Sequence, residues 1–260
     1  MSEPLILEES SGAIAAITLN DPRRLNILSS AMMTALALAI ETYGDDTATR
    51  VILLKANGKA FCAGHDLGEL NVDGAPTPKK RAQFDQLFSQ CTSLMQLIGQ
   101  ISQPVITLVH GVATAAGCQL VASSDIALAS TDAKFGLNGI DIGLFCSTPM
   151  VAASRAMQPK TCFEMLVSGR FLSAQEAQQS GLVTRVVAPG ALFDEGEALA
   201  ARIADKQASA IALGKKAFYA QLEASIDDAY RTGKAAIVKN LLLAQTQDRI
   251  SAFRNKRHKP

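Results

Sequence analysis

The sequence predicts an α/β protein, and two features of the chain lead to that prediction. Short runs of apolar and β-branched residues alternate with segments whose apolar residues fall at helical spacing, and the last part of the chain has helical spacing alone. We therefore expect a mixed core over residues 1–190 and a helical region over residues 191–260. With 260 residues, of which 48% are apolar and 19% charged, the chain can bury a large core.

Charge and hydropathy argue against several classes of partner. The formal net charge of +1 does not suit a nucleic-acid surface, which needs a basic face. The longest apolar stretch, residues 104–130, is interrupted by His110, Gln119 and Asp125, so it is not expected to span a membrane. Residues 1–4 carry neither a signal-peptide nor a transit pattern, and we expect a cytoplasmic protein.

The cysteines and histidines do not form a recognisable framework. The five cysteines are odd in number, widely spaced and without a CxxC pair, which favours reduced thiols. The three histidines are far apart in the sequence, so we expect no metal site. The residues concerned are Cys62, Cys91, Cys118, Cys146, Cys162, His65, His110 and His258.

The chain begins with a predicted hairpin and a helix. Residues 5–7 and 14–19 read as paired strands, because apolar residues flank a Ser-Ser-Gly turn at residues 10–12. Ser29 is a suitable N-cap for a helix whose apolar residues recur at helical spacing, and Gly44 is its predicted end.

Strands and one long helix are predicted for the middle of the chain. Residues 51–55, 104–109 and 126–129 are short apolar runs typical of buried strands. A single apolar stripe over residues 84–98 predicts the clearest helix, and it is more typical of core packing than of a cofactor site. Before it, residues 71–80 contain a glycine and two prolines and read as a mobile loop, which is either an ordinary connection or a lid.

The predicted core ends at a proline-glycine pair. Ser173 and Glu176 have capping-box spacing at the start of a short helix that Gly181 ends, and residues 183–187 form a last strand. Residues 189–190 then mark a boundary. A terminal helical segment as long as the one that follows packs either against another subunit or back over the domain.

Two glycine-containing turns are the candidate functional features. Residues 62–67 (CAGHDL) and 115–120 (AAGCQL) each contain small residues where a helix is expected to begin. Unpaired N–H groups at a helix start can hold developing negative charge, and two of them aimed at one point form an oxyanion hole. The alternative is that alanine and glycine only permit tight packing. The signatures of serine hydrolases, nucleotide-binding loops and zinc peptidases are absent from the sequence.

These blocks resemble the crotonase superfamily, which is the enoyl-CoA hydratase/isomerase family. The resemblance covers residues 51–70, 104–125, 173–187 and 251–257, and it is nearest to the branch of enoyl-CoA hydratase domain-containing proteins. It implies a ClpP-like spiral of repeated ββα units and a C-terminal helical trimerisation region, in a homotrimer or a dimer of trimers. The repetition of the two turns about 53 residues apart suits such a unit. It also implies a lyase or isomerase of fatty-acid or acyl-CoA metabolism.

The resemblance further implies a binding site for an acyl-CoA thioester as the small-molecule partner. In that family the thioester carbonyl lies between two backbone N–H groups, which by position are those of His65 and Ala116. CoA enters as part of the substrate, and no tightly bound cofactor is expected. Seven residues match CoA contacts of the family: Arg24, Ala63, His65, Asp66, Leu67, Phe253 and Lys256. In the family, the contacts that Phe253 and Lys256 match often come from a neighbouring subunit.

Two positions depart from the pattern of hydratases in this family. Those enzymes use two glutamates to activate a water, and the matching positions here hold Gln119 and Gly139. An amide orients water but cannot accept its proton, and glycine has no side chain. Three polar groups could replace the glutamates: Asp141, the ring of His65, and Cys146 with Ser147, which could line the acyl pocket. The His65 ring could either bind an acyl carboxylate or exchange protons near the carbonyl. The alternatives are a surface or capping role for Asp141 and core packing for Cys146. The candidate catalytic residues are therefore His65, Ala116, Gln119 and Asp141.

Three functions follow from these residues. The first is an acyl-CoA enzyme of the enoyl-CoA hydratase/isomerase family that stabilises a thioester enolate, with ordinary hydration disfavoured. The second is a decarboxylase of malonyl-type CoA thioesters, because loss of CO₂ itself generates the enolate and needs no base. The third is a protein that binds CoA thioesters without catalysis.

Overall fold

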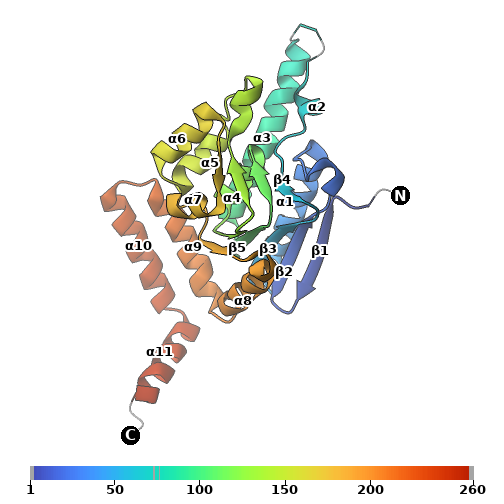
Figure 1. Cartoon of the computed structure of the whole chain (residues 1–260). Helices are drawn as coiled ribbons and strands as arrows, with labels where there is room; N and C mark the ends of the chain where they lie inside the picture. Colours follow the sequence, from blue (N-terminus) through green and yellow to red (C-terminus); the bar gives the residue numbers. More distant parts are fainter. Residues whose placement is uncertain (1–2, 73, 76, 258–260) are drawn as a thin grey trace. The chain divides into compact units, whose positions relative to one another are not determined.

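The computed structural model describes residues 3–72, 74–75 and 77–257, and the chain divides into two units, Met1–Asp205 and Lys206–Pro260 (Figure 1). The predicted division after residue 190 differs from this boundary. Helix α8 (Leu192–Ala204) belongs to the first unit, because Leu192 and Ala200 are fully buried among side chains of the sheet. The predicted role of the C-terminal region in oligomerisation stays a prediction.

The first unit is built on a six-stranded sheet. The strand order is β1-β2-β3-β5-β7-β10, in which β1 and β2 form the predicted antiparallel hairpin and the other neighbours are parallel. The strands predicted in the middle of the chain are confirmed as β3, β5 and β7. The bounds are β1 (Ile6–Ser11), β2 (Ile14–Leu19), β3 (Val51–Ala56), β5 (Val105–Val109), β7 (Ile126–Ser130) and β10 (Arg185–Val187).

Helix α1 (Ser30–Asp45) begins where the sequence predicts. The Ser29 hydroxyl accepts a hydrogen bond from the Met32 N–H, which satisfies one of the unpaired donors at the helix start. Gly44 does not end the helix. A Cβ atom on Gly44 would lie 2.7 Å from Cγ2 of Ile101, so the glycine makes room for the packing of that side chain.

Helices α3 (Pro78–Gln100) and α7 (Ala174–Ser180) also begin after residues whose side chains cap them. Thr77 caps α3, so the loop predicted for residues 71–80 ends before Pro78. Ser173 and Glu176 form the predicted capping box of α7, and Gly181, with a φ of 99°, ends it. In the described part of the chain, every helix is too short or too polar to cross a membrane. The remaining bounds are α2 (Leu67–Leu70), α3 (Pro78–Gln100), α4 (Ala116–Ser123), α5 (Pro149–Ala156), α6 (Pro159–Ser168), α7 (Ala174–Ser180), α9 (Ala208–Leu222), α10 (Ile226–Leu241), α11 (Ala244–Arg257), η1 (Pro22–Arg24), η2 (Asn138–Ile142) and η3 (Pro189–Ala191).

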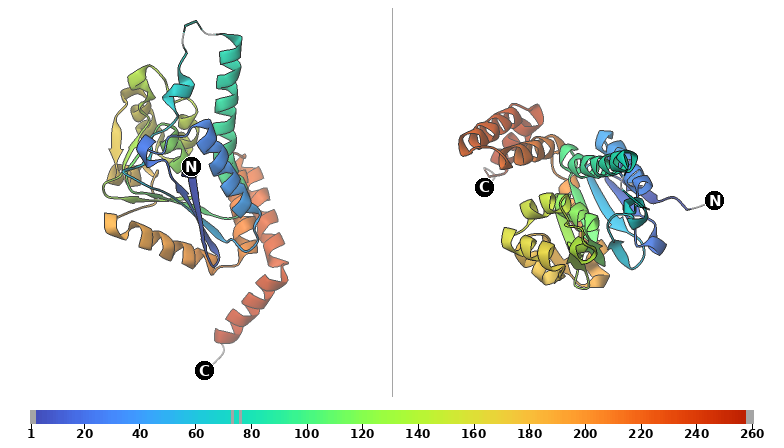
Figure 2. Two further views of the ribbon diagram at one scale, coloured as in Figure 1. Left: turned by 90° about the vertical axis from the view of Figure 1, so that its right-hand side faces the viewer. Right: turned by 90° about the horizontal axis from the view of Figure 1, so that it is seen from above.

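The central strands of the large sheet are buried on both faces, which is why they read as continuous apolar runs. In β3, Ile52 and Leu54 pack into the main core with α1 and α3, whereas Val51 and Leu53 pack with α8. Figure 2 shows α8 lying across one face of this sheet, with α1 and α3 on the other side. The two faces therefore belong to two separate apolar clusters.

A second sheet of four short strands has no counterpart among the predicted elements. Its order is β4-β6-β8-β9, with β4, β6 and β8 parallel and β9 antiparallel to β8. Three residues are too few for an alternation of apolar and polar side chains to be recognised in a sequence. The bounds are β4 (Ala60–Cys62), β6 (Val112–Thr114), β8 (Lys134–Gly136) and β9 (Phe171–Ser173).

Asn26 anchors the segment that connects β2 to α1. Its side chain is fully buried, and its amide nitrogen donates to the carbonyl oxygens of Asn57 (2.8 Å) and Ala60 (2.9 Å). Its Oδ1 accepts a hydrogen bond from the Asp21 N–H at 2.8 Å. The backbone φ of 53° is left-handed, a conformation that asparagine tolerates better than most residues. The connecting segment is thereby held against the start of β4.

Replacing Asn26 with alanine is expected to lower the free energy of unfolding by about 3 kcal/mol, because three backbone groups, one buried and two partly buried, lose their partner. Urea unfolding followed by circular dichroism measures the change. Asn57→Ala is the matched control, since it removes an exposed side chain and keeps the carbonyl that Asn26 uses; it should cost about 0.5 kcal/mol or less. Equal losses in the two variants would contradict the anchoring role.

Candidate functional site

The two glycine-containing turns lie side by side because they follow neighbouring parallel strands. Ala60 of β4 is paired with Val112 of β6, so the carboxyl ends of both strands meet at one edge of the small sheet. Strand β8 runs parallel to β6, and η2 follows it at the same edge. The sheet thus gathers both turns and the segment that holds Gly139 and Asp141.

The backbones of the two turns are in close contact. A Cβ atom on Gly64, whose φ is 89°, would lie 3.4 Å from the amide nitrogen of Ala116. A Cβ atom on Gly117 would lie only 2.2 Å from the carbonyl oxygen of Cys62. Glycine is therefore required at both positions. The amide of Ala116 lies next to the turn that carries His65.

Both predicted N–H donors lack the usual backbone partner. Ala116 is the first residue of α4, where N–H groups have no intrahelical acceptor. Ala115 before it has a φ of 49°, a conformation that an alanine rarely adopts and that is held by the surrounding structure. In the described part of the chain, the His65 N–H also donates no backbone hydrogen bond. The arrangement suits an oxyanion hole, whose function stays a prediction.

The His65 ring lies between the segment before α1 and helix α3. Its Nδ1 is 3.3 Å from the carbonyl oxygen of Leu28, and its centroid is 5.3 Å from that of Phe88 in an edge-on contact. Its Nε2 is buried, with no hydrogen-bond partner among the described residues. Burial lowers the pKa of His65 below its ordinary value, against smaller opposite effects of Leu28 and Glu69. The imidazole is therefore neutral at pH 7.

Gln119 lies one turn beyond Ala116 on α4 and is buried. Its Oε1 accepts a hydrogen bond from the Cys91 thiol of α3, at a sulfur–oxygen distance of 3.8 Å. Burial raises the pKa of Cys91 to about 11, so this thiol keeps its proton and can donate it. The amide is thus engaged with α3, a contact that the sequence analysis missed.

Gly139 is covered by the loop that follows η2. A Cβ atom on Gly139 would lie 2.6 Å from the carbonyl oxygen of Leu144 and 2.9 Å from Sγ of Cys146. The Gly139 N–H also donates to that sulfur at 3.4 Å. The fold around this residue therefore leaves no room for a glutamate side chain without a shift of the loop.

Asp141 is exposed, and Asn138 links it to the small sheet. The Asn138 amide donates to Oδ2 of Asp141 at 3.4 Å, and Thr114 at the end of β6 donates to Oδ1 of Asn138. A Cβ atom on Gly169 would lie 2.5 Å from Oδ1 of Asp141. Among the described residues, no hydrogen bond joins Asp141 directly to either turn. Asn138 was not predicted as a site residue, because an asparagine before a glycine is typical of an ordinary turn.

Four of the residues that match CoA contacts lie together on the surface next to the first turn. Arg24 donates to Asp66 at 2.6 Å, and the Ala63 N–H donates to the Leu25 carbonyl at 3.1 Å, while Leu67 is 59% exposed. Burial raises the pKa of Asp66, but hydrogen bonds, led by the one from Arg24, outweigh it, so the net pKa lies below its ordinary value. Asp66 is ionised at pH 7.

Besides His65, the remaining two of the seven matching residues belong to the second unit. Phe253 lies on α11 and is 61% exposed. Lys256 lies on the same helix, but its side chain falls outside the described residues. Their predicted contact with CoA stays a prediction.

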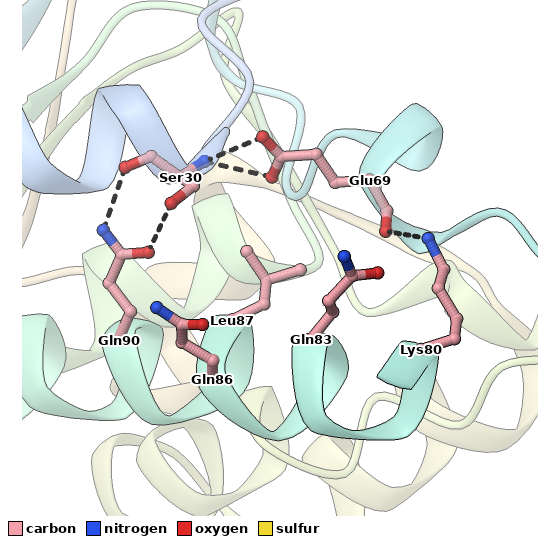
Figure 3. Close-up of a pocket in the computed structure, with 7 residues that line it drawn as sticks. All are labelled: Ser30, Glu69, Lys80, Gln83, Gln86, Leu87 and Gln90. Atoms are coloured by element: carbon pink, nitrogen blue, oxygen red, sulfur yellow. Dashed lines mark hydrogen bonds between the residues drawn. The ribbon is translucent and has the colours of Figure 1, made fainter. Parts of the chain in front are cut away.

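A cavity of about 320 Å³ lies beside the first turn, between α1, α2 and α3 (Figure 3). The Glu69 carboxylate accepts the Ser30 N–H at 3.0 and 3.2 Å, at the N-terminus of α1, where negative charge is favoured. Lys80 donates to the Glu69 carbonyl oxygen at 3.4 Å. This cavity was not predicted from the sequence, because its lining residues are mostly polar or charged and read as an exposed helix face. It is lined by Ser30, Glu69, Lys80, Gln83, Gln86, Leu87 and Gln90.

The cysteines fit the sequence prediction. All five are free and buried. In the part of the chain that the structure describes, His, Cys, Asp and Glu side chains form no group of three that could hold a metal ion.

The chain matches the family model "Enoyl-CoA hydratase/isomerase" over residues 9–260. Its fold is the crotonase fold of enzymes that act on CoA thioesters, which confirms the predicted fold class. The chain belongs to the enoyl-CoA hydratase/isomerase family. Membership of this family makes it an acyl-CoA enzyme.

Similar proteins cover almost the whole chain. Enoyl-CoA hydratase domain-containing protein 3, mitochondrial, from Danio rerio is 44% identical over 98% of this chain and 87% of that protein. The crystal structure of an enoyl-CoA hydratase from Mycobacterium smegmatis is similar with a TM-score of 0.93 and 46% identity, and it covers 98% of this chain and 97% of that one. The crystal structure of human enoyl-CoA hydratase domain-containing protein 3 has a TM-score of 0.92 and 40% identity, with 99% of both chains covered.

The expectation of a cytoplasmic protein is wrong. Relatives from Danio rerio, Rattus norvegicus and Homo sapiens are named as mitochondrial proteins. The expectation rested on residues 1–4 and on composition. A compartment is assigned by an address that receptors read, and neither composition nor the packing of a folded domain records it.

Replacing Gly117 with alanine is expected to lower the free energy of unfolding by about 3 kcal/mol, because the new methyl group meets the Cys62 carbonyl. Chemical denaturation measures the loss. Gly190→Ala is the control, since nothing lies within 4 Å of a Cβ atom there, and its effect should stay within about 0.5 kcal/mol. A Gly117→Ala variant as stable as this control would contradict the close approach of the turns.

Proposed function

We propose that this protein binds an acyl-CoA thioester with its carbonyl oxygen between the N–H groups of His65 and Ala116, and that it stabilises the enolate of that thioester. The close approach of the two turns carries this proposal: a Cβ atom on Gly64 would lie 3.4 Å from the Ala116 nitrogen. Pre-oriented donors stabilise developing charge on an oxygen, and losing one typically costs about 10²- to 10³-fold in rate.

Hydration through a pair of carboxylates is disfavoured in this proposal. Gln119 offers an amide, which is bonded to the Cys91 thiol, and Gly139 has the Leu144 carbonyl where a side chain would begin. Neither position supplies a group that accepts a proton from water. The reaction we favour is therefore one that passes through an enolate without activation of water by two glutamates.

A second candidate is decarboxylation of a malonyl-type CoA thioester. The same lack of carboxylates at positions 119 and 139 favours it, because loss of CO₂ leaves the electron pair on the carbon next to the carbonyl. The oxyanion hole would stabilise the enolate so formed, and no base would be required.

Incubation with crotonyl-CoA and, separately, methylmalonyl-CoA, followed by mass spectrometry of the products, tests these reactions. We expect hydration of crotonyl-CoA to be at least about 10²-fold slower than in an enzyme that activates the water by general acid–base catalysis. Loss of CO₂ from methylmalonyl-CoA would favour the second candidate. Hydroxyacyl-CoA formed at an enzymatic rate would contradict the proposal, and binding of acyl-CoA without turnover of any thioester would indicate a non-catalytic binder.

We further propose that the C-terminal region, residues 191–260, assembles the chain into a homotrimer or a dimer of trimers, in which Phe253 and Lys256 reach the CoA of a neighbouring subunit. The large apolar side chains exposed on the second unit support it. Light scattering is expected to give a molar mass of three or six chains, and a monomer would contradict the proposal. These side chains include Phe218, Leu222, Ile226, Tyr230 and Leu242.

A further inference from the structure

We propose that the imidazole of His65 removes the proton from the carbon next to the thioester carbonyl. One residue would then supply an oxyanion donor through its backbone and the base through its side chain. This inference rests on the proposed function, because it requires a thioester held by the His65 N–H. It assigns the acid–base role to a group outside the two positions that hold glutamates in the hydratases of the family.

The surroundings of the ring determine which nitrogen carries the proton. Nδ1 of His65 faces the Leu28 carbonyl oxygen at 3.3 Å, and a carbonyl oxygen can only accept, so Nδ1 is the protonated nitrogen of the neutral ring. Nε2 then carries the lone pair, and it is buried without a partner among the described residues. Buried polar atoms are almost always hydrogen-bonded, so an unused lone pair at this place points to a bond made with substrate.

The groups around the ring keep it neutral and able to accept a proton. Phe88 on α3 and the Leu28 carbonyl face it without a charge, and Glu69 on α2 is the charged side chain that acts on it in the described part of the chain. Burial lowers the pKa of His65, whereas Glu69 favours the imidazolium that forms after proton transfer. A neutral ring is a base and a poor partner for a carboxylate, which favours proton removal over the binding of an acyl carboxylate.

The His65 ring also lies near the part of α3 that the Gln119 side chain contacts. The His65 ring contacts Phe88 of α3, and Gln119, one turn beyond Ala116, contacts Cys91 about one turn further along α3. The ring and the amide therefore contact neighbouring turns of α3. In our proposal, the carbon next to a carbonyl held by both donors lies beside this part of α3.

The proposed step needs no water and no co-reactant. Nε2 takes the proton, the carbon–hydrogen electron pair forms a carbon–carbon double bond, and the carbonyl π electrons move to the oxygen, where both N–H groups hold the charge. The imidazolium then returns a proton to the same carbon, which restores the thioester. With a 3-enoyl thioester it can deliver the proton to carbon 4 instead, which moves the double bond to carbon 2.

Uptake of deuterium by butyryl-CoA in D₂O, measured by mass spectrometry with the full chain, tests this step. A saturated thioester can be neither hydrated nor decarboxylated, so exchange reports proton removal alone. The His65→Asn variant keeps the backbone N–H and an amide that can donate to Leu28, and it lacks Nε2. We expect it to exchange about 10²- to 10⁴-fold more slowly than wild type, with a Kd for butyryl-CoA within about threefold.

His110→Asn is the matched control, because His110 bonds to the Gly58 carbonyl outside both turns; it should leave exchange unchanged. Exchange by His65→Asn within about tenfold of wild type would overturn the inference and leave His65 as a positioning residue, while the proposed enolate chemistry would stand. A wild-type protein that binds butyryl-CoA and exchanges no deuterium would also overturn the inference, and it would leave decarboxylation, which forms the enolate without a base, as the enolate chemistry of the site.

The pH profile of wild-type exchange provides a readout that does not depend on a variant. The active form of the ring is the neutral one, and the pKa of His65 lies below the ordinary value of 6.5. The rate constant is therefore expected to be level around pH 7 and to fall as the ring is protonated at lower pH. A fall in the rate constant at the pKa that an NMR titration measures for His65 supports the ring as the base. A fall that follows a carboxylate near pH 4 would overturn it.

Discussion

The approach of Gly117 to the carbonyl oxygen of Cys62 is the constraint on which the rest of the site depends. A Cβ atom there would lie 2.2 Å from that oxygen, so the start of α4 meets the end of β4 without any side chain between them. The parallel pairing of β4 with β6 produces this contact, because it ends both strands at one edge. The position of the Ala116 amide beside the His65 turn follows from that pairing.

A second set of contacts holds the first turn from the opposite side. Asn26 fixes the segment before α1 to the start of β4, and the Leu28 N–H donates to the Gly64 carbonyl at 2.7 Å. The Leu28 carbonyl in turn faces Nδ1 of His65. Leu28 therefore fixes both the backbone of the first turn and the tautomer of the His65 ring. The buried amide of Asn26 thus helps to position the proposed site without belonging to it.

The residues at positions 119 and 139 limit what the proposed site can do. Neither Gln119 nor Gly139 has a carboxylate that could accept a proton, and the loop over Gly139 fills the space that a longer side chain would need. The oxyanion donors do not depend on side-chain identity, since every non-proline residue carries an N–H. In our proposal the site therefore stabilises an enolate without these carboxylates, and the neutral ring of His65 transfers the proton.

Sequence patterns among neighbouring residues predicted much of the fold and part of the candidate site. Apolar runs predicted the α/β class and the long strands, the Ser29 and Ser173 caps were read from neighbouring residues, and the glycine turns led to the family. The four three-residue strands of the small sheet could not be read in this way, because they are shorter than the alternation that identifies a strand. The surroundings of His65 and Gln119 were likewise set by packing against α3, whose residues are distant in the chain. Burial, tautomer and pKa depend on contacts between distant segments, and those contacts exist only once the whole core has formed.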